Sequence, residues 1–308
     1  MSIDASGQTT RIDAKRLREL STRRDGPAAL RMAVHLGLVL ALAAISIAVS
    51  ETRGFFWAIP FIAMQGILMA FLFMPLHETV HRTAFRTEAL NTVFGHLCGL
   101  AICFPWEYYR VFHWAHHRHT QDEAHDPELA VMPSAGSLWQ RLLAFSGALQ
   151  VYGRFRVLLR HALTGTSTLP WVPTDKRALI VREARLYLAA YAGLAAASLL
   201  FRSPLILTVW LGPLLIGQFA LRPYLYTEHT GCGRSRSAFE NTRTTYTNAV
   251  IRWFAWNMPY HAEHHAYPSV PFHALPAANA LVAAGLRHTE AGYPRSMKAA
   301  WRALRLQT

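Results

Sequence analysis

Long apolar runs separated by polar, histidine-rich segments form the dominant pattern of this chain. Residues 28–50 are almost continuously apolar, and residues 54–76 form a second run of similar length. Each run has about the 20 residues that a helix needs to cross a bilayer. Only a tight turn from Ser50 to Arg53 connects them. The pattern therefore predicts a membrane-spanning helical hairpin.

A second pair of apolar runs covers residues 183–201 and 204–226, with Pro204 at the turn. Proline at a turn, and a Gly-Pro pair such as that at 212–213, are tolerated in membrane helices. Residues 90–105 are apolar but too short to span comfortably, which favours an interfacial or re-entrant helix. We therefore predict an all-α integral membrane protein with four transmembrane helices in two hairpins.

The positions of the basic residues predict the orientation. The first 31 residues contain seven Lys or Arg, whereas each short connection contains one. Lys and Arg accumulate on the cytoplasmic side, so we expect both termini and the long 77–182 segment there. An uncleaved N-terminal anchor fits better than a signal peptide, because the cationic region is long and a second apolar run follows closely. The expected units are a cytoplasmic N-terminal segment, a membrane domain and a cytoplasmic tail, over residues 1–27, 28–285 and 286–308.

Composition supports the membrane class and argues against nucleic acid as a partner. The chain is 52% hydrophobic and 16% charged, against about 25% charged in an average soluble protein. Its net charge of +13 comes from arginines that flank the apolar runs, which is the pattern expected for contact with the anionic cytoplasmic leaflet. No zinc-finger, RNP or helix-turn-helix pattern is visible. The three cysteines form no CxxC pair, and they are too few for a four-thiolate iron–sulfur cluster.

Three histidine clusters lie on the predicted cytoplasmic side of the apolar runs. They are His77 and His81, then His113, His116 and His117, and finally His261, His264 and His265. Residues three and four apart share a helix face, so each cluster points its imidazoles in one direction. Neutral imidazole suits zinc, copper, iron and nickel, and eight rings exceed the four ligands of one tetrahedral zinc. We therefore predict a two-metal site in a cytoplasmic helical cap.

Five further polar residues are candidates for the same site. His229, just beyond the fourth apolar run, is a candidate additional ligand. Glu78 and Glu263 lie inside clusters but off the histidine face, where they could accept imidazole N–H bonds and fix the ring tautomers. Asp126 and Asn241 are candidate polar supports for ligating rings. The Glu-x-x-His pairs of soluble four-helix di-iron proteins are replaced here by His-x-x-His-His, which occurs twice.

Two other classes of protein fit part of the pattern. His77, Glu78 and His81 match H-E-x-x-H, the motif of zinc proteases in which the glutamate is the general base. A membrane zinc hydrolase would leave the other six clustered histidines unexplained. A metal transporter is a weaker alternative, because its histidines should lie within the spans rather than beyond one end of them.

The three boxes together resemble those of the membrane fatty acid desaturase superfamily, which also contains hydroxylases and carotenoid ketolases. The match is His77-x-x-x-His81, His113-x-x-His116-His117 and His261-x-x-His264-His265, in order, in spacing and in placement relative to the two hairpins. The resemblance spans about 28–276. Any single box would be a weak signal, but the combination is highly specific.

The resemblance implies a four-span enzyme with two non-haem irons and a cytoplasmic active site. We expect its location to be the bacterial inner (plasma) membrane. Family members use an additional histidine between the second and third boxes, and His229 fits that place. In such enzymes O2 is the co-substrate, and hydrogen is taken from an unactivated C–H bond of a long-chain aliphatic or acyl substrate. Fatty acyl (lipid) desaturation is the leading reaction. The three-residue spacing of the first box leaves hydroxylase, ketolase and other monooxygenase activity open.

No fused electron-transfer domain is visible, because the chain lacks a four-cysteine pattern, a glycine-rich dinucleotide fingerprint and a haem module. We therefore expect a separate ferredoxin-type electron carrier and its reductase as partners. Such carriers are often acidic, and an arginine-rich cytoplasmic face would attract one electrostatically.

Overall fold

The computed structural model describes residues 11–129 and 138–305, which are mostly helical. Residues 1–10 of the predicted N-terminal segment and 306–308 of the predicted tail lie outside the described residues. The first half contains α1 (Ala14–Leu20), α2 (Asp25–Arg53), α3 (Phe55–Phe71), α4 (Phe73–Val80), α5 (Glu88–Ala101), α6 (Trp106–His119), α7 (Leu138–Phe145) and α8 (Ala148–Thr164). The second half contains η2 (Thr174–Lys176), α9 (Arg177–Leu200), η3 (Leu207–Leu211), α10 (Gly212–His229), α11 (Ala238–Asn241), β1 (Arg243–Tyr246), α12 (Ala249–Phe254), α13 (His261–Ala266), η4 (Phe272–Ala274), α14 (Leu275–Val282), η5 (Ala283–Gly285), β2 (His288–Ala291) and α15 (Tyr293–Arg305).

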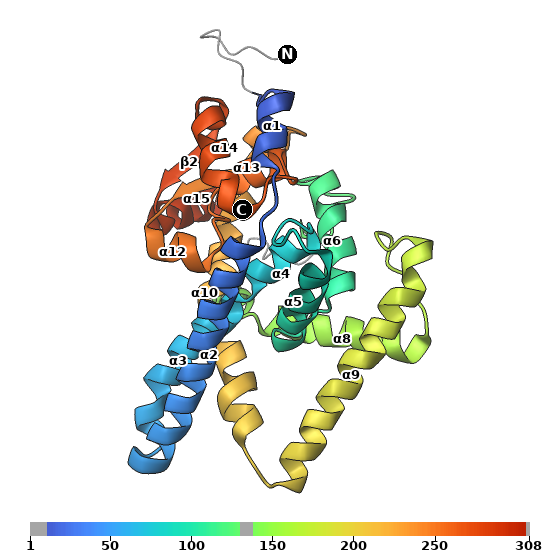
Figure 1. Cartoon of the computed structure of the whole chain (residues 1–308), viewed down its shortest axis with the longest axis vertical. Coiled ribbons are helices and arrows are strands. Elements are labelled where there is room, and N and C mark those ends of the chain that lie inside the picture. Colours follow the sequence, from blue (N-terminus) through green and yellow to red (C-terminus); the bar gives the residue numbers. More distant parts are fainter. Residues whose placement is uncertain (1–10, 130–137, 306–308) are drawn as a thin grey trace.

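The first predicted hairpin is α2 followed by α3 and α4. The turn is Gly54, whose φ of 96° falls in a region that residues with a Cβ rarely adopt. The Gly54 N–H donates to the Ser50 carbonyl at 3.1 Å and ends α2. Asp25–Arg53 and Phe55–Val80 are each long and apolar enough to cross a membrane. In Figure 1 this hairpin extends away from the end of the molecule that holds α1 and α12–α15.

The second predicted hairpin corresponds to α9 and to η3 with α10, which form the V at the lower end of Figure 1. Their outer surfaces are apolar: Leu199 is 80% exposed, Leu200 77% and Phe219 58%. Among the described residues, however, only the two helices of the first hairpin are each long and apolar enough to cross a membrane. The pair α5 and α6, bent by 97°, makes a third candidate if it is one broken span. The four-span arrangement therefore stays a prediction.

Two glycines allow the hairpins to pack closely. Gly66 on α3 faces the backbone of Pro213 and Gly217 on α10, and a Cβ added at either glycine would overlap the facing backbone. Small residues at such crossings let membrane helices approach until their backbones touch. Because α4 continues from α3, this contact fixes the start of α4 relative to the end of α10, where the first histidine cluster and His229 lie.

The N-terminal helix α1 and the C-terminal elements from α11 to α15, with β1 and β2, lie at the same end of the molecule, and we call this unit the cap. The Ile12 N–H donates to the Tyr267 hydroxyl at 3.0 Å, which ties the residues before α1 to the end of α13. The strands β1 and β2 pair in parallel, with Arg243 opposite His288. The all-α prediction therefore holds for the described residues apart from this two-stranded sheet.

The predicted C-terminal tail is an integral part of the cap. Its strand β2 forms half of the sheet, and its helix α15 packs on α10, where the rings of Tyr293 and Tyr224 lie 4.9 Å apart. The hydroxyls of Thr245 and Ser296 are 2.8 Å apart, and Ala300 is fully buried. Residues 286–305 therefore pack against residues of the 28–285 unit, although the sequence pattern assigned them to a separate tail.

Candidate metal centre

The structure brings all nine predicted histidine ligands together. Four segments supply them: α4 with its C-cap, α6, the last residue of α10, and α13. The first gives His77 and His81, the second His113, His116 and His117, the third His229, and the fourth His261, His264 and His265. Helical spacing places each cluster on one face, as predicted, and the packing of the four segments turns those faces toward one another.

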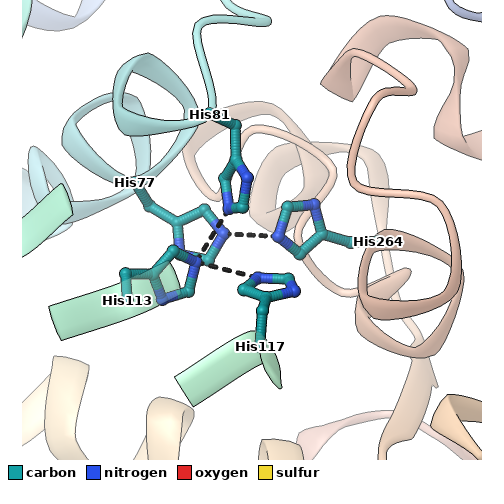
Figure 2. A group of neighbouring side chains, drawn as sticks. All are labelled: His77, His81, His113, His117 and His264. Atoms are coloured by element: carbon teal, nitrogen blue, oxygen red, sulfur yellow. Dashed lines mark hydrogen bonds between the residues drawn. The ribbon is translucent and has the colours of Figure 1, made fainter. Parts of the chain in front are cut away.

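Five of the rings form one group, which we call group A: His77, His81, His113, His117 and His264. Each offers one ring nitrogen, and these five nitrogens lie within 4.8 Å of one another. The Nε2 atoms of His77 and His264 are 2.8 Å apart, those of His81 and His113 are 2.8 Å apart, and those of His113 and His117 are 3.0 Å apart. Figure 2 shows all five rings converging from three segments on a common centre.

The other four rings form group B. His116, His229 and His265 offer nitrogens within 4.8 Å of one another. His116 Nε2 lies 3.2 Å from His229 Nε2, and His261 Nε2 lies 3.1 Å from the same atom. The stacked rings of His117 and His265, with centroids 4.0 Å apart, place group B directly beside group A.

Seven of the nine rings are buried, and His117 and His265 are half-buried. Eight are held in the neutral form, whereas the pKa of His116 is raised, because its burial is outweighed by attraction to Glu128 and by the contact with Asp126. Burial lowers the pKa of His229 and of His264 to about 3, with the neighbouring His116 adding repulsion in both cases. Burial also lowers the pKa of His81, His261 and His265 well below its usual value. A neutral imidazole keeps one nitrogen lone pair, which is the form that binds a metal.

The geometry of the donors fits shared cations. A metal–imidazole bond is about 2.0–2.1 Å, so two nitrogens at right angles on one ion lie about 2.9 Å apart. The Nε2 pairs in both groups, at 2.8–3.2 Å, match that separation. The single Nε2 of His113 faces two other Nε2 atoms, and the buried Nε2 of His265 has no hydrogen-bond partner. Lone pairs directed at a common cation explain both observations.

Two of the four predicted supports contact imidazole rings. His116 Nδ1 donates to Asp126 Oδ1 at 2.9 Å, which leaves its Nε2 lone pair directed into group B. Asn241 acts through its backbone carbonyl, which accepts from His229 Nδ1 at 3.3 Å. The Asn241 side chain makes other hydrogen bonds: its Oδ1 accepts from the Thr242 hydroxyl, and its Nδ2 donates to the Ser235 carbonyl. Such contacts fix the tautomer and orientation of a ligating ring.

The imidazole contacts expected for Glu78 and Glu263 do not occur. Glu78 Oε1 accepts from the Thr83 hydroxyl at 2.7 Å and from the Phe272 N–H at 3.0 Å. Glu263 accepts from the Thr244 hydroxyl at 2.6 Å and from the Asn279 amide. Adjacent residues on a helix lie about 100° apart, so a glutamate next to a ligating histidine faces the surrounding packing. Both carboxylates therefore join the cap to the histidine-bearing helices.

Two carboxylates that the sequence did not single out flank group B. Glu128 Oε2 lies 3.3 Å from His116 Nε2, and Glu228 Oε2 lies 3.5 Å from His261 Nε2. Burial raises the pKa of both, and repulsion by Glu128 raises that of Glu228 further. The sequence analysis had not identified these two carboxylates as neighbours of the imidazoles. The position of Glu228 directly before His229 was the one available signal.

A cavity of about 450 Å³ reaches the histidines from the side of α6, α8 and α10. Its walls are mainly aromatic and aliphatic and include Phe73, Phe104, Tyr109 and Leu225. His77, His113, His116 and His261 lie at its margin, so both groups border it. This volume falls in the range of pockets that hold small molecules. An apolar molecule in it would place its carbon atoms next to the imidazole rings.

Comparison with known proteins agrees with this geometry. The model of the family "Fatty acid desaturase" matches residues 55–296. The chain is 29% identical to a sphingolipid delta(4)-desaturase of Drosophila melanogaster over 227 residues, which are 68% of this chain and 61% of that protein. It is 25% identical to a delta(8)-fatty-acid desaturase of Euglena gracilis over 232 residues, which are 66% of this chain and 55% of that protein. The chain thus spans little more than half the length of these two relatives.

Proposed function

Given that the chain belongs to the fatty acid desaturase family, we propose that it is an O2-dependent, membrane-bound di-iron oxidoreductase, with desaturation of a fatty acyl or related lipid chain as its leading reaction. The observation that carries the proposal is the convergence of nine histidines, most of them buried, into two adjacent groups at the margin of an apolar cavity. Group A and group B would each hold one iron.

Bound irons supply the activation of O2 and the removal of hydrogen from an unactivated C–H bond, and the chain's own residues do the rest. The cavity walls hold an aliphatic substrate against the histidines and keep water from the reacting carbon. Asp126 and the Asn241 carbonyl hold His116 and His229 with Nε2 turned inward. The buried carboxyl groups of Glu128 and Glu228 can hold a proton beside group B, because burial raises the pKa of both.

The proposed topology has four spans, with α9 and α10 as the second hairpin and the active site on the cytoplasmic side of the inner membrane. The support is the apolar, outward-facing surface of α9 and α10 together with the basic residues near the cap. A large apolar surface of this kind is unfavourable in water and favourable in a bilayer. Both termini then share the cytoplasmic side with the histidine groups.

A separate, acidic ferredoxin-type carrier with its reductase is the proposed electron donor. Exposed cationic residues occur on α15 and on the loop between α10 and α11, where Arg234 pairs with Glu123: Arg234, Arg236, Arg295, Lys298 and Arg302. Charge complementarity of this kind raises association rates more than it raises affinity. The carrier would therefore dock on the cap, on the side of the protein that holds the histidines.

The zinc hydrolase alternative is disfavoured by the position of Glu78. A general base must reach the water that it activates, whereas Glu78 is bonded to Thr83 and Phe272 on the far side of the helix from the imidazoles. A hydroxylase or ketolase would use the same histidines. The products formed by the enzyme, rather than the metal site, separate these reactions from desaturation.

The test combines metal analysis with product analysis. The full-length protein purified under mild conditions should contain about two irons per chain, in line with a two-metal histidine site. Lipids of a host expressing it should gain O2-dependent double bonds. His264→Ala should lose iron and activity while remaining in the membrane, whereas His288→Ala, on β2 outside both groups, should keep both. A protein that contains zinc alone and stays active without O2 would contradict the proposal. If the lipids gain hydroxyl groups instead of double bonds, the reaction is hydroxylation rather than desaturation.

A further inference from the structure

Two arginines line the cavity whose walls are otherwise mainly apolar. Arg154 on α8 and Arg222 on α10 both border it, on elements that carry only one of the nine histidines. Cationic side chains rarely occupy a buried apolar site without a partner, because removing a charge from water is costly. The partners of these two guanidinium groups therefore indicate which charge a ligand in the cavity would carry.

Arg222 is only partly satisfied. Its Nε donates to Gln218 Oε1 at 3.0 Å, one turn earlier on α10. Its Nη2 is buried and has no hydrogen-bond partner. A guanidinium presents five N–H donors in a planar fork, so the unbonded edge of Arg222 is available to a ligand in the cavity that it lines.

Arg154 is held in place by contacts that do not neutralise its charge. Its guanidinium carbon lies 4.0 Å from the ring centre of Phe104, and its Nη1 lies 3.5 Å from the Ile102 carbonyl. Burial lowers the pKa of Arg154 to about 10, so it is still a cation at neutral pH. Arg154 and Arg222 also repel one another.

The acidic residues of the cavity are directed at the histidines. Glu128 and Glu228 lie 3.3 and 3.5 Å from imidazole nitrogens of group B. Neither arginine forms an ion pair with a carboxylate in residues 11–129 and 138–305. Glu128 attracts Arg222 from a longer distance, but no carboxylate in the described parts of the chain lies within 4.0 Å of either guanidinium group.

We propose that Arg154 and Arg222 form an anion subsite that binds the carboxylate of an aliphatic substrate inside the cavity, so that the enzyme acts on a free acid whose charged end is enclosed by the protein. This inference rests on the proposed oxidoreductase function and specifies the substrate of the same site. The planar fork of arginine matches a carboxylate in a bidentate arrangement. A monoanion is favoured over a dianionic phosphate because the mainly apolar walls of the cavity make the transfer of a second negative charge from water more costly.

The dimensions limit the size of the substrate and the position of attack. A volume of about 450 Å³ corresponds to the space of about 15 waters in liquid, which suits an acid of about that many non-hydrogen atoms. Arg222 precedes His229 by seven residues on α10, which is about 10 Å along a helix. The enclosed carboxylate would fix which carbon lies next to the histidines.

Binding measurements on the full-length protein in nanodiscs test the subsite without turnover. The probes are octanoate, its uncharged counterparts methyl octanoate and 1-octanol, and octyl phosphate, each titrated calorimetrically against empty nanodiscs. Octanoate should bind, and Arg222→Gln should weaken its binding at least about tenfold, the effect of losing a charge-assisted hydrogen bond. Arg222→Lys should recover part of the loss. Binding of 1-octanol should be unchanged in both variants.

Arg154→Gln gives a second, independent measurement on another helix, and Arg160→Gln is its matched control. Arg160 is exposed on the same helix α8 and bonds Thr168, so its replacement should leave octanoate binding unchanged. Equal binding of octanoate by the wild type and both subsite variants would overturn the proposal, as would equal affinity for octanoate and methyl octanoate. Tighter binding of octyl phosphate would overturn the assignment to a carboxylate. Because no step requires O2 or reductant, these outcomes are independent of the iron and product assays.

Discussion

Gly66 on α3 and Gly217 on α10 lie in backbone contact, and a Cβ at Gly217 would overlap the Gly66 carbonyl. This contact is more than a packing detail, because each helix leads directly into the metal centre. Six residues after α3 ends comes His77, and His229 is the last residue of α10. The separation of these two helices therefore sets the separation of ligands in group A and group B.

Gly217→Ala should push the two helices apart and weaken metal binding. Overpacking of a close contact costs about 1–3 kcal/mol, so we expect a lower melting temperature together with a lower iron content. Gly193→Ala on α9 is the matched control, since a Cβ there meets nothing within 4 Å. That variant should be as stable as the wild type or slightly more stable. Full iron loading of Gly217→Ala would show that the crossing does not position the ligands.

Asp126→Asn should lower metal affinity without unfolding the protein. The Asp126 carboxylate accepts the Nδ1 proton of His116 at 2.9 Å and the Gln121 N–H at 3.0 Å. Loss of such a support to a ligating ring typically reduces metal affinity by about 10–100-fold. Competition with a chelator measures this directly. Asp175→Asn is the control, because Asp175 is exposed and pairs with Lys176 outside the histidine groups; the idea fails if both variants release iron equally.

Glu78→Gln should retain activity to within a few-fold. The amide oxygen can still accept from the Phe272 N–H and the Thr83 hydroxyl, which are the contacts that Glu78 makes in the structure. A general base removed in this way would instead cost about 10²–10⁴-fold in rate. Turnover by the variant therefore separates a structural glutamate from the catalytic glutamate of an H-E-x-x-H hydrolase. Glu78→Ala should be markedly less stable, because it leaves the buried Phe272 N–H unpaired.

The sequence predicted those features of the site that depend on local periodicity. Imidazoles at i, i+3 and i+4 share a helix face wherever the helix lies, so the eight clustered histidines could be grouped before their tertiary arrangement was known. His229 was added by its place just beyond the fourth apolar run and by the resemblance. The supports depend on packing between distant segments and were predicted less well. Asp126 contacts His116 ten residues away, whereas Glu78 bonds Phe272 across 194 residues, and no local pattern encodes that contact.

The fold likewise divides into elements that local sequence patterns predict and elements that depend on contacts between distant segments. Long apolar runs predicted the hairpin of α2 and α3, because a run of about twenty apolar residues is typical of a helix that crosses a membrane. The strands β1 and β2 contain four residues each and pair across more than forty residues of chain, so neither has a periodic signal of its own. Arg154 and Arg222 escaped notice for a related reason, since each is a single arginine in a helix and becomes unusual only when the cavity between the helices is known.

Cysteine labelling at three exposed positions tests the predicted topology. Thr52 lies at the end of α2, Arg202 lies between α9 and η3, and Arg236 lies in the cap, and all three are exposed. With four spans, Thr52→Cys and Arg202→Cys should react with a membrane-impermeant maleimide added outside intact cells, while Arg236→Cys should react only after permeabilisation. The native cysteines provide a low background, because Cys98 and Cys103 are buried and burial raises the pKa of the Cys232 thiol to about 11, which keeps it in the unreactive protonated form. If the second hairpin lies along the inner surface instead, Arg202→Cys will behave like Arg236→Cys while Thr52→Cys still labels from outside, and the prediction of four spans will be replaced by one of two.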